Sequence, residues 1–147
     1  MTYTIRSYEP NDYEQLIELY KRSELYGGVF DEERDSFDRL NKRVEADSDS
    51  IIVAVNSGGK IIGTVSLIED GRVAWLYRFC VLPMHDDIEN WKNVTSDLNN
   101  HAIESLKKKG HKEVLVYTSQ DETLHKRYLD LGFTKGNDYT CFWKHIK

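Results

Sequence analysis

Residues 51–83 have the sequence IIVAVNSGGKIIGTVSLIEDGRVAWLYRFCVLP, which contains three runs rich in β-branched and aromatic residues. Ser57-Gly58-Gly59 separates the first run from the second, and Asp70-Gly71 separates the second from the third. Short polar segments with glycine between such runs are typical of hairpin turns. Pro83 ends the third run, because proline cannot donate a hydrogen bond to a neighbouring strand. The stretch therefore predicts an antiparallel meander.

The residues before the meander predict a strand followed by two helices. Residues 2–8 alternate as a strand does, and the segment 10–12, Pro-Asn-Asp, favours the start of a helix that Gly27-Gly28 ends. Residues 31–49 are strongly charged but carry apolar side chains at helical spacing, which indicates a second, well-solvated helix.

The residues after the meander predict a helix, a strand, a helix and a last strand. The first helix contains residues 98–106 and ends in a lysine run and a glycine, the strand spans 113–118, the next helix spans 121–131, and the last strand spans 139–145. This order favours an α/β fold with a mixed, mostly antiparallel sheet and helices on its faces. A chain of 147 residues without a linker or repeat predicts a single domain over 1–147.

The composition of the chain indicates which kind of molecule the protein binds and in which cellular compartment it works. The formal charge of −5 argues against duplex nucleic acid as the main partner and favours a small molecule or a protein. Cys80 and Cys141 have no CxxC spacing, and the N-terminal residues 1–10 show neither a basic nor an apolar signal region. No apolar stretch approaches the roughly 20 residues that span a bilayer. We therefore expect a reduced, cytoplasmic protein that does not enter a membrane.

Residues 121–133, DETLHKRYLDLGF, carry the most informative pattern in the chain. The segment resembles the N-x-x-A-x-x-[FL]-Y-x-x-x-G-F helix of the GNAT superfamily, the acyl-CoA-dependent N-acyltransferases. Tyr128, Gly132 and Phe133 match outright, while Asp121 stands at the asparagine position, Leu124 at the alanine position and Arg127 at the apolar position. The strand end at 81–83, Val-Leu-Pro, and the segment 107–119, KKKGHKEVLVYTS, extend the resemblance over essentially the full length.

The resemblance implies where acetyl-CoA binds and which group assists the chemistry. The strand that ends at Pro83 would splay from the strand at 114–118, and the pantetheine arm would lie between them, paired with backbone groups around Cys80, Val81 and Leu82. Asp121 and Leu124 would contact the cofactor as well.

In the resemblance, Tyr128 faces the thioester sulfur. A phenol with a pKa near 10 is protonated at neutral pH and can donate its proton to the departing thiolate. The alternative is that Tyr128 is a core residue, because it shares a helix face with Leu124 and Leu131.

One part of the chain departs from the family pattern. The family's [RQ]-x-x-G-x-[GA] loop, which binds pyrophosphate through backbone amides, is absent, since no glycine occurs between Gly71 and Gly110. Acidic residues surround this stretch, with Lys92 as its cation; they are Asp86, Asp87, Glu89 and Asp97. A helix start at residues 93–96 could still accept a phosphate through free amides. Ordinary capping is the alternative for these residues, which are Asn93, Val94, Thr95 and Ser96.

Two functions therefore remain. The first is an N-acyltransferase, with Tyr26 and Phe30 lining an acceptor groove whose acidic surroundings at 31–49 attract an amine of a small molecule or peptide. The second is a GNAT-fold domain with weakened CoA binding that acts as a ligand-binding or protein-interaction module.

The acidic run at 85–89 favours a solvated loop over a metal site, and the basic residues at 107–112 and 125–127 favour solvated helix ends over nucleic acid. Many relatives are dimers, so a homodimer is a further expectation.

Overall fold

A computed structural model describes residues 2–22 and 30–146. The chain divides into two compact units, Met1–Tyr117 and Thr118–Lys147, which are described separately. The single domain over 1–147 stays a prediction.

The first unit is built on a sheet of antiparallel strands in the order β1-β2-β3-β4. The strands are β1 (Tyr3–Ser7), β2 (Ile51–Asn56), β3 (Ile61–Glu69) and β4 (Ala74–Val81). Each follows its predicted run, so the meander predicted from residues 51–83 is confirmed.

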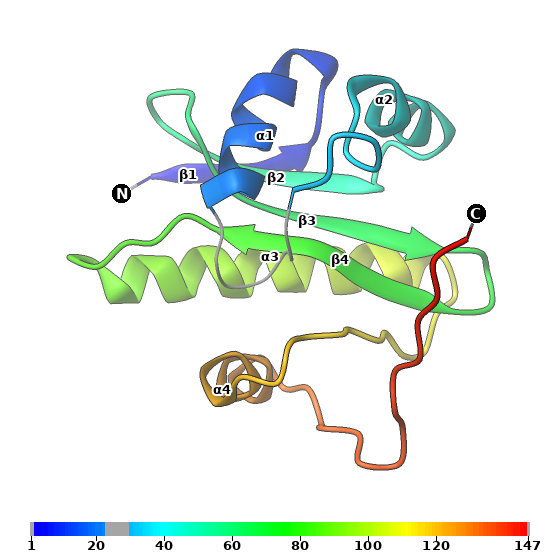
Figure 1. The fold of residues 1–147 in the computed structure, drawn as a ribbon. Coiled ribbons are helices and arrows are strands. Elements are labelled where there is room, and N and C mark those ends of the chain that lie inside the picture. Colours follow the sequence, from blue (N-terminus) through cyan, green and yellow to red (C-terminus); the bar gives the residue numbers. More distant parts are fainter. Residues whose placement is uncertain (1, 23–29, 147) are drawn as a thin grey trace. The chain divides into compact units, whose positions relative to one another are not determined.

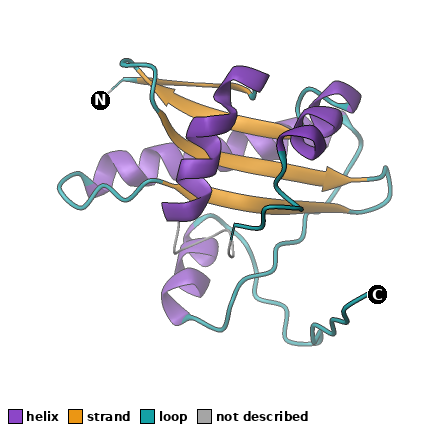
Figure 2. Ribbon diagram, turned by 45° about the horizontal axis from the view of Figure 1, so that its top comes forward, coloured by secondary structure: helices purple, strands orange, loops and turns teal. Residues whose placement is uncertain are grey.

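Helices cover both faces of this sheet. The first unit contains the short 3-10 helix η1 (Pro10–Asp12) and the helices α1 (Tyr13–Arg22), α2 (Phe37–Ala46) and α3 (Ile88–Lys108). Figures 1 and 2 show α1 and α2 on one face of the sheet and α3 across the other. This is the α/β arrangement that the element order predicts.

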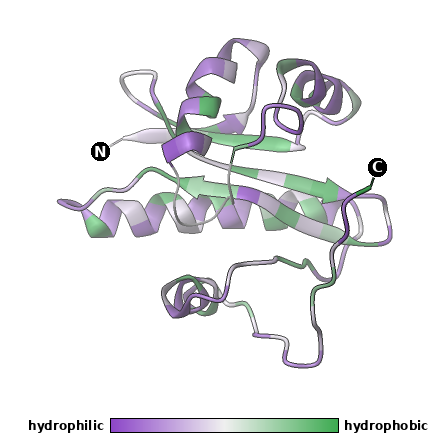
Figure 3. Ribbon diagram, viewed as in Figure 1, coloured by the Kyte–Doolittle hydropathy of each residue, from purple (hydrophilic) through white to green (hydrophobic). Residues whose placement is uncertain are grey.

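Apolar residues at helical spacing attach these helices to the sheet. On α1, Leu16, Ile17 and Tyr20 are buried against β2 and β3 residues. On α3, the buried apolar side chains are Val94, Leu98, Ala102 and Leu106. Because strands β2, β3 and β4 are covered on both faces, they form the most hydrophobic part of the unit in Figure 3.

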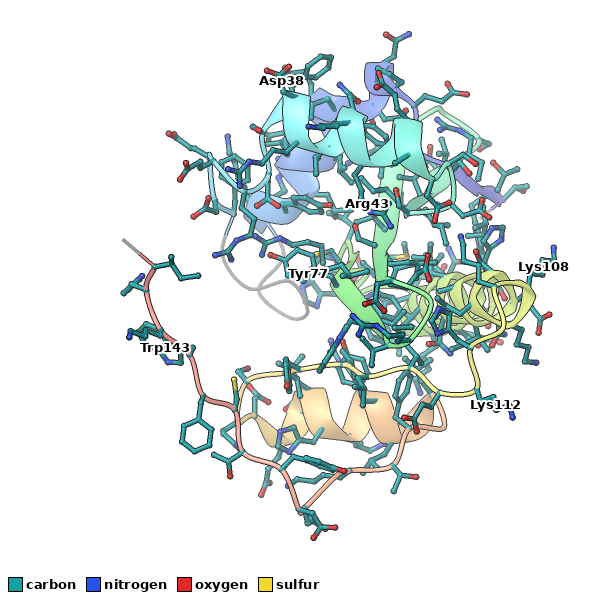
Figure 4. All side chains as sticks on the ribbon, turned by 90° about the vertical axis from the view of Figure 1, so that its right-hand side faces the viewer. Asp38, Arg43, Tyr77, Lys108, Lys112 and Trp143 are labelled. Atoms are coloured by element: carbon teal, nitrogen blue, oxygen red, sulfur yellow. The ribbon has the colours of Figure 1, made fainter. Side chains whose placement is uncertain are left out.

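The second unit contains one helix, α4 (Glu122–Asp130), as predicted for residues 121–131. The strand predicted at 139–145 is wrong, because these residues form no strand in the described part of the chain. Its side chains are mostly exposed, including Trp143, which Figure 4 marks on the C-terminal segment. The predicted strand at 113–118 shrinks to a single bridging residue, Leu115. Composition identified residues suited to a pleated surface, but a strand also needs a partner backbone, which composition does not supply.

None of the helices in the described ranges combines the length and apolar character that a bilayer crossing requires.

Candidate functional site

Strand β4 contains a bulge. Tyr77 faces Ser66 of β3 and Cys80 faces Thr64, so β4 has one more residue than β3 between these pairs. Arg78 lies inside the bulge with a φ of 49°, in the left-handed region. A bulge bends and twists its strand and changes which backbone groups face which neighbour.

The outer edge of β4 pairs with residues 113–117 near its start. The amide of Leu76 donates to the Leu115 carbonyl at 2.9 Å, and the Leu115 amide donates to the Ala74 carbonyl at 2.9 Å. This parallel bridge between Trp75 and Leu115 is the one pairing of β4 with residues 113–117 in the described chain. No further bridge joins the two segments in the described ranges, and the expected splay stays a prediction.

The bulge decides which of the three predicted cofactor residues at the end of β4, Cys80, Val81 and Leu82, directs its backbone groups away from β3. The amide of Leu82 donates to the Ile62 carbonyl of β3 at 2.8 Å, and Cys80 is aligned with Thr64 of the same strand. Backbone groups in an antiparallel pair alternate in direction, so Val81 directs its N–H and C=O away from β3. The expectation for Leu82 needs correction, because its amide is already bonded to β3. The Cys80 side chain is fully buried, as expected for a structural thiol.

The predicted helix start at 93–96 is wrong. Helix α3 begins at Ile88, and the side chain of its N-cap residue, Asp87, accepts a hydrogen bond from the Asn90 amide at 3.1 Å. Asn93, Val94, Thr95 and Ser96 therefore lie within the helix, where backbone amides bond to the preceding turn. A cofactor role that relied on their free amides loses its physical basis. The missing glycines explain the early start, because nothing between Pro83 and Gly110 interrupts a helix.

The actual start of α3 is acidic. Asp86, Asp87 and Glu89 are exposed there. The side-chain nitrogen of Asn90 is buried and has no hydrogen-bond partner within residues 2–22 and 30–146. Carboxylates at this position repel a polyphosphate. A phosphate at this helix start would therefore meet negative charge.

In the second unit, the predicted motif residues shape and terminate α4. Asp121 is the N-cap, and its Oδ1 accepts hydrogen bonds from the amides of Thr123 at 2.8 Å and Leu124 at 3.3 Å. Gly132 has a φ of 92°, which a glycine after a helix adopts without strain. Asp121 therefore has a structural role that needs no cofactor, and contact with a cofactor stays a prediction.

Tyr128 lies on the buried face of α4. Its side chain and that of Leu124 are each 5% exposed, and its ring packs edge-on against Phe133 at 5.5 Å between centroids. This packing accounts for the Y-x-x-x-G-F spacing, since Gly132 turns the chain and brings Phe133 back to the ring. Burial fits both the core role and the catalytic role that the sequence leaves open.

The sequence from residue 13 to residue 133 matches the profile of the Acetyltransferase (GNAT) family. The chain belongs to this family. N-acetyl transfer is therefore its class of activity. The search of curated proteins found no match to the chain.

Solved GNAT structures resemble the chain in fold. The PaiA N-acetyltransferase of Thermoplasma acidophilum, crystallised with coenzyme A, is 24% identical, with 95% of this chain and 94% of that chain covered and a TM-score of 0.73. A GNAT acetyltransferase of Staphylococcus aureus Mu50 is 17% identical, with 99% and 94% covered and a TM-score of 0.74. Glucosamine-6-phosphate N-acetyltransferase of Arabidopsis thaliana is 23% identical, with full coverage of both chains (100% each) and a TM-score of 0.66. At these identities the likeness shows the fold alone.

Sequence reasoning missed one buried ion pair of this GNAT chain. Arg78 of β4 donates from Nε to Asp35 Oδ1 at 3.1 Å and from Nη2 to Asp35 Oδ2 at 2.7 Å. The two residues are 4% and 1% exposed. The sequence contains one indication of this pair, which is an arginine within the otherwise apolar run WLYRFCV. A charged side chain in a strand that is buried on both faces needs a partner of opposite charge.

The two residues predicted to line an acceptor groove have different outcomes. Tyr26 lies outside the described residues. Phe30 packs against the buried cluster around α1, and the Lys21 Nζ lies 5.1 Å from its ring centroid.

Among the described side chains, no three His, Cys, Asp or Glu residues converge as metal ligands do.

Proposed function

We propose that this GNAT protein transfers an acetyl group from acetyl-CoA to a primary amine of a small molecule or peptide. The observation that carries the proposal is the open edge of β4 just past the bulge. There Val81 directs a donor and an acceptor outward, and a pantetheine amide can pair with them as a further strand would.

Tyr128 is the proposed general acid. The neutral amine attacks the thioester carbonyl, the C–N bond forms and the C–S bond breaks. The departing thiolate takes the phenol proton, and the proton lost by the amine nitrogen returns to the phenol directly or through solvent, so the proton balance closes. The family motif around Tyr128 supports this role.

The segment before α2 supports a cationic acceptor. Asp31, Glu32 and Glu33 are exposed side by side on the first unit. The Asp31 carboxylate is charged at neutral pH, and a hydrogen bond from the Arg34 backbone amide lowers its pKa further. Phe30, which directly precedes these carboxylates, is the proposed lining residue. A cytoplasmic location and a homodimer are part of the same proposal.

The acidic start of α3 bears on how tightly the enzyme holds the CoA phosphates, and a ligand-binding or interaction module with weakened CoA binding is kept only as the alternative outcome of the test below. Asp86, Asp87 and Glu89 occupy the region in which the family has its phosphate loop. In this case the β4 edge would still be open, but the intact cofactor would be held weakly.

Calorimetric titrations with acetyl-CoA and with S-acetyl-pantetheine distinguish the two functions. An N-acetyltransferase that holds mainly the thioester arm should bind both compounds and release free thiol when it is given a panel of a diamine, an amino sugar and a short peptide. Absence of binding at about millimolar acetyl-CoA would contradict the enzyme proposal, because such weak affinity is below that of a working co-substrate site.

A further inference from the structure

Arg78 occupies a backbone conformation that an arginine rarely adopts. Its φ of 49° lies in the left-handed region, where a side chain with a Cβ is strained. Bulges with a left-handed first residue normally have glycine at that position. Since this chain has arginine instead, interactions of the side chain must compensate for the strain.

Asp35 supplies the strongest of these interactions. The bidentate pair uses two nitrogens of Arg78 and both carboxylate oxygens of Asp35, and it is closed to solvent. The rings of Tyr77 and Tyr20 lie 4.8 Å and 5.7 Å from the guanidinium carbon. Figure 4 marks Tyr77 on β4. The guanidinium is therefore fixed in direction as well as neutralised.

Asp35 is itself held in place. Its Oδ2 accepts the Asp31 amide at 3.0 Å, its own amide donates to the Asp31 carbonyl at 2.8 Å, and its carbonyl accepts the Tyr13 hydroxyl at 2.9 Å. The carboxylate is thus bonded to the segment before α2, and the Asp35 backbone is bonded to helix α1. It can resist movement of the strand that carries Arg78.

The bulge determines the direction of the backbone groups after it. Before the bulge the Leu76 amide points away from β3 and bonds to Leu115, and after the bulge the Leu82 amide points to β3. Without the extra residue, strict alternation would turn Leu82 outward and pair Val81 with β3. The outward direction of Val81 therefore depends on Arg78 keeping its left-handed conformation.

We propose that the Arg78–Asp35 pair holds the β4 bulge and thereby presents Val81 to the thioester arm of the cofactor. Both are positioning residues, since they act through the backbone of β4. The cofactor part rests on the proposed function, whereas the effect on the bulge does not.

Two double variants test the proposal, Arg78→Met with Asp35→Asn and Arg78→Gly with Asp35→Asn. Both remove the ion pair without leaving a buried charge, and the shared asparagine keeps an acceptor for the Asp31 amide. Glycine adopts a positive φ without strain, whereas methionine does not. Methionine fills more of the space of the arginine side chain than glycine does. If Arg78 served only to fill that space, the methionine variant would therefore be more stable and would bind CoA more tightly than the glycine variant.

Backbone NMR of the free protein measures the bulge directly. In the wild type and in the glycine variant we expect contacts between Thr64 and Cys80 across β3 and β4, and slow hydrogen exchange at the Leu82 amide. In the methionine variant we expect the Thr64–Cys80 contacts and the slow exchange at Leu82 to be lost. If the methionine variant does not fold while the glycine variant does, the result also supports the proposal. Retention in both variants, or loss in both, would overturn the proposal.

Titration with coenzyme A separates this inference from the proposed function. The methionine variant should bind CoA about tenfold or more weakly than the wild type, while the glycine variant stays within about threefold. Equal weakening in both variants would overturn the link to the cofactor. If the wild type itself does not bind CoA, the proposed function fails, and the NMR comparison still decides whether the pair holds the bulge.

Discussion

At the scale of single residues, Tyr128 carries most of the proposed chemistry. It is buried on α4 and packed against Phe133, so its ring is well ordered whatever its role. A core residue contributes through its ring, whereas a general acid contributes through its hydroxyl. Removing the hydroxyl alone therefore separates the two roles.

Tyr128→Phe should lower kcat about a hundredfold, because it removes the proton donor for the thiolate. Affinity for acetyl-CoA and resistance to urea should change little. Steady-state kinetics with the fastest amine of the acceptor panel measures the effect, and Tyr139→Phe, at an exposed tyrosine of the same unit, is the control. Unchanged turnover in Tyr128→Phe would remove this residue from the mechanism.

Asp121 is the second residue whose role can be isolated. Asp121→Ala should destabilise α4 by about 1 kcal/mol because it removes the N-cap, whereas Asp121→Asn should keep most of the cap. Circular dichroism of both variants during urea unfolding provides the comparison. Equal losses for Ala and Asn would mean that capping is not the reason for an Asp at this position.

At the scale of elements, the contact between α3 and β3 depends on a glycine. A Cβ at Gly63 would lie 2.8 Å from Leu98 Cδ1 and 3.3 Å from Val94 Cγ1, both on α3. The close approach of helix to strand at this point leaves no room for a side chain. This contact also fixes the position of α3, the helix that follows the end of β4.

Gly63→Ala should lower the free energy of unfolding by about 1–3 kcal/mol, because the helix or its side chains must shift. Gly58→Ala is a matched control, since a Cβ there meets only Asn56 Oδ1 at 3.4 Å. Urea denaturation of both variants measures the difference. A Gly63→Ala protein as stable as the control would show that α3 adapts without strain.

The elements also show what the sequence can predict. Local patterns predicted β1 to β4, α1, α2 and α4, because alternation, helical spacing and turn residues are properties of neighbouring positions. The acidic run at 85–89 favours a loop by composition, but Asp87 is also a strong N-cap residue, and α3 begins directly after it. The pairing of Arg78 with Asp35 and the missing strand at 139–145 depend on contacts between distant positions, which neither spacing nor composition reveals.

At the scale of the whole molecule, carboxylates link separate parts of the first unit. Burial raises the pKa of Asp12, but hydrogen bonds from Arg6 and from the Glu9 backbone amide outweigh it, so the pKa is lowered. A hydrogen bond from His111, which follows α3, lowers the pKa of Glu69 at the end of β3. Groups with lowered pKa values stabilise the folded state while they are ionised.

Stability should therefore be lost in acid. The contribution of these carboxylates is present above their ordinary pKa values of 3.8 for Asp and 4.5 for Glu, and it disappears as the pH falls through the lower folded values. Urea unfolding between pH 3 and pH 6, about the range in which carboxylates titrate, measures this loss. Glu69→Gln should flatten the pH dependence, and Glu113→Gln at an exposed position should not. An identical slope in the wild type and Glu69→Gln would contradict the assignment.

The most direct test of the account is amide hydrogen exchange at Val81 with and without acetyl-CoA. The Leu82 amide, already bonded to Ile62 of β3, is an internal reference. We predict that saturating acetyl-CoA slows exchange at Val81 and leaves Leu82 nearly unchanged, because the Val81 amide points away from β3 whereas the Leu82 amide is bonded to it. Binding of acetyl-CoA without any slowing at Val81 would contradict the claim that the thioester arm pairs with this strand.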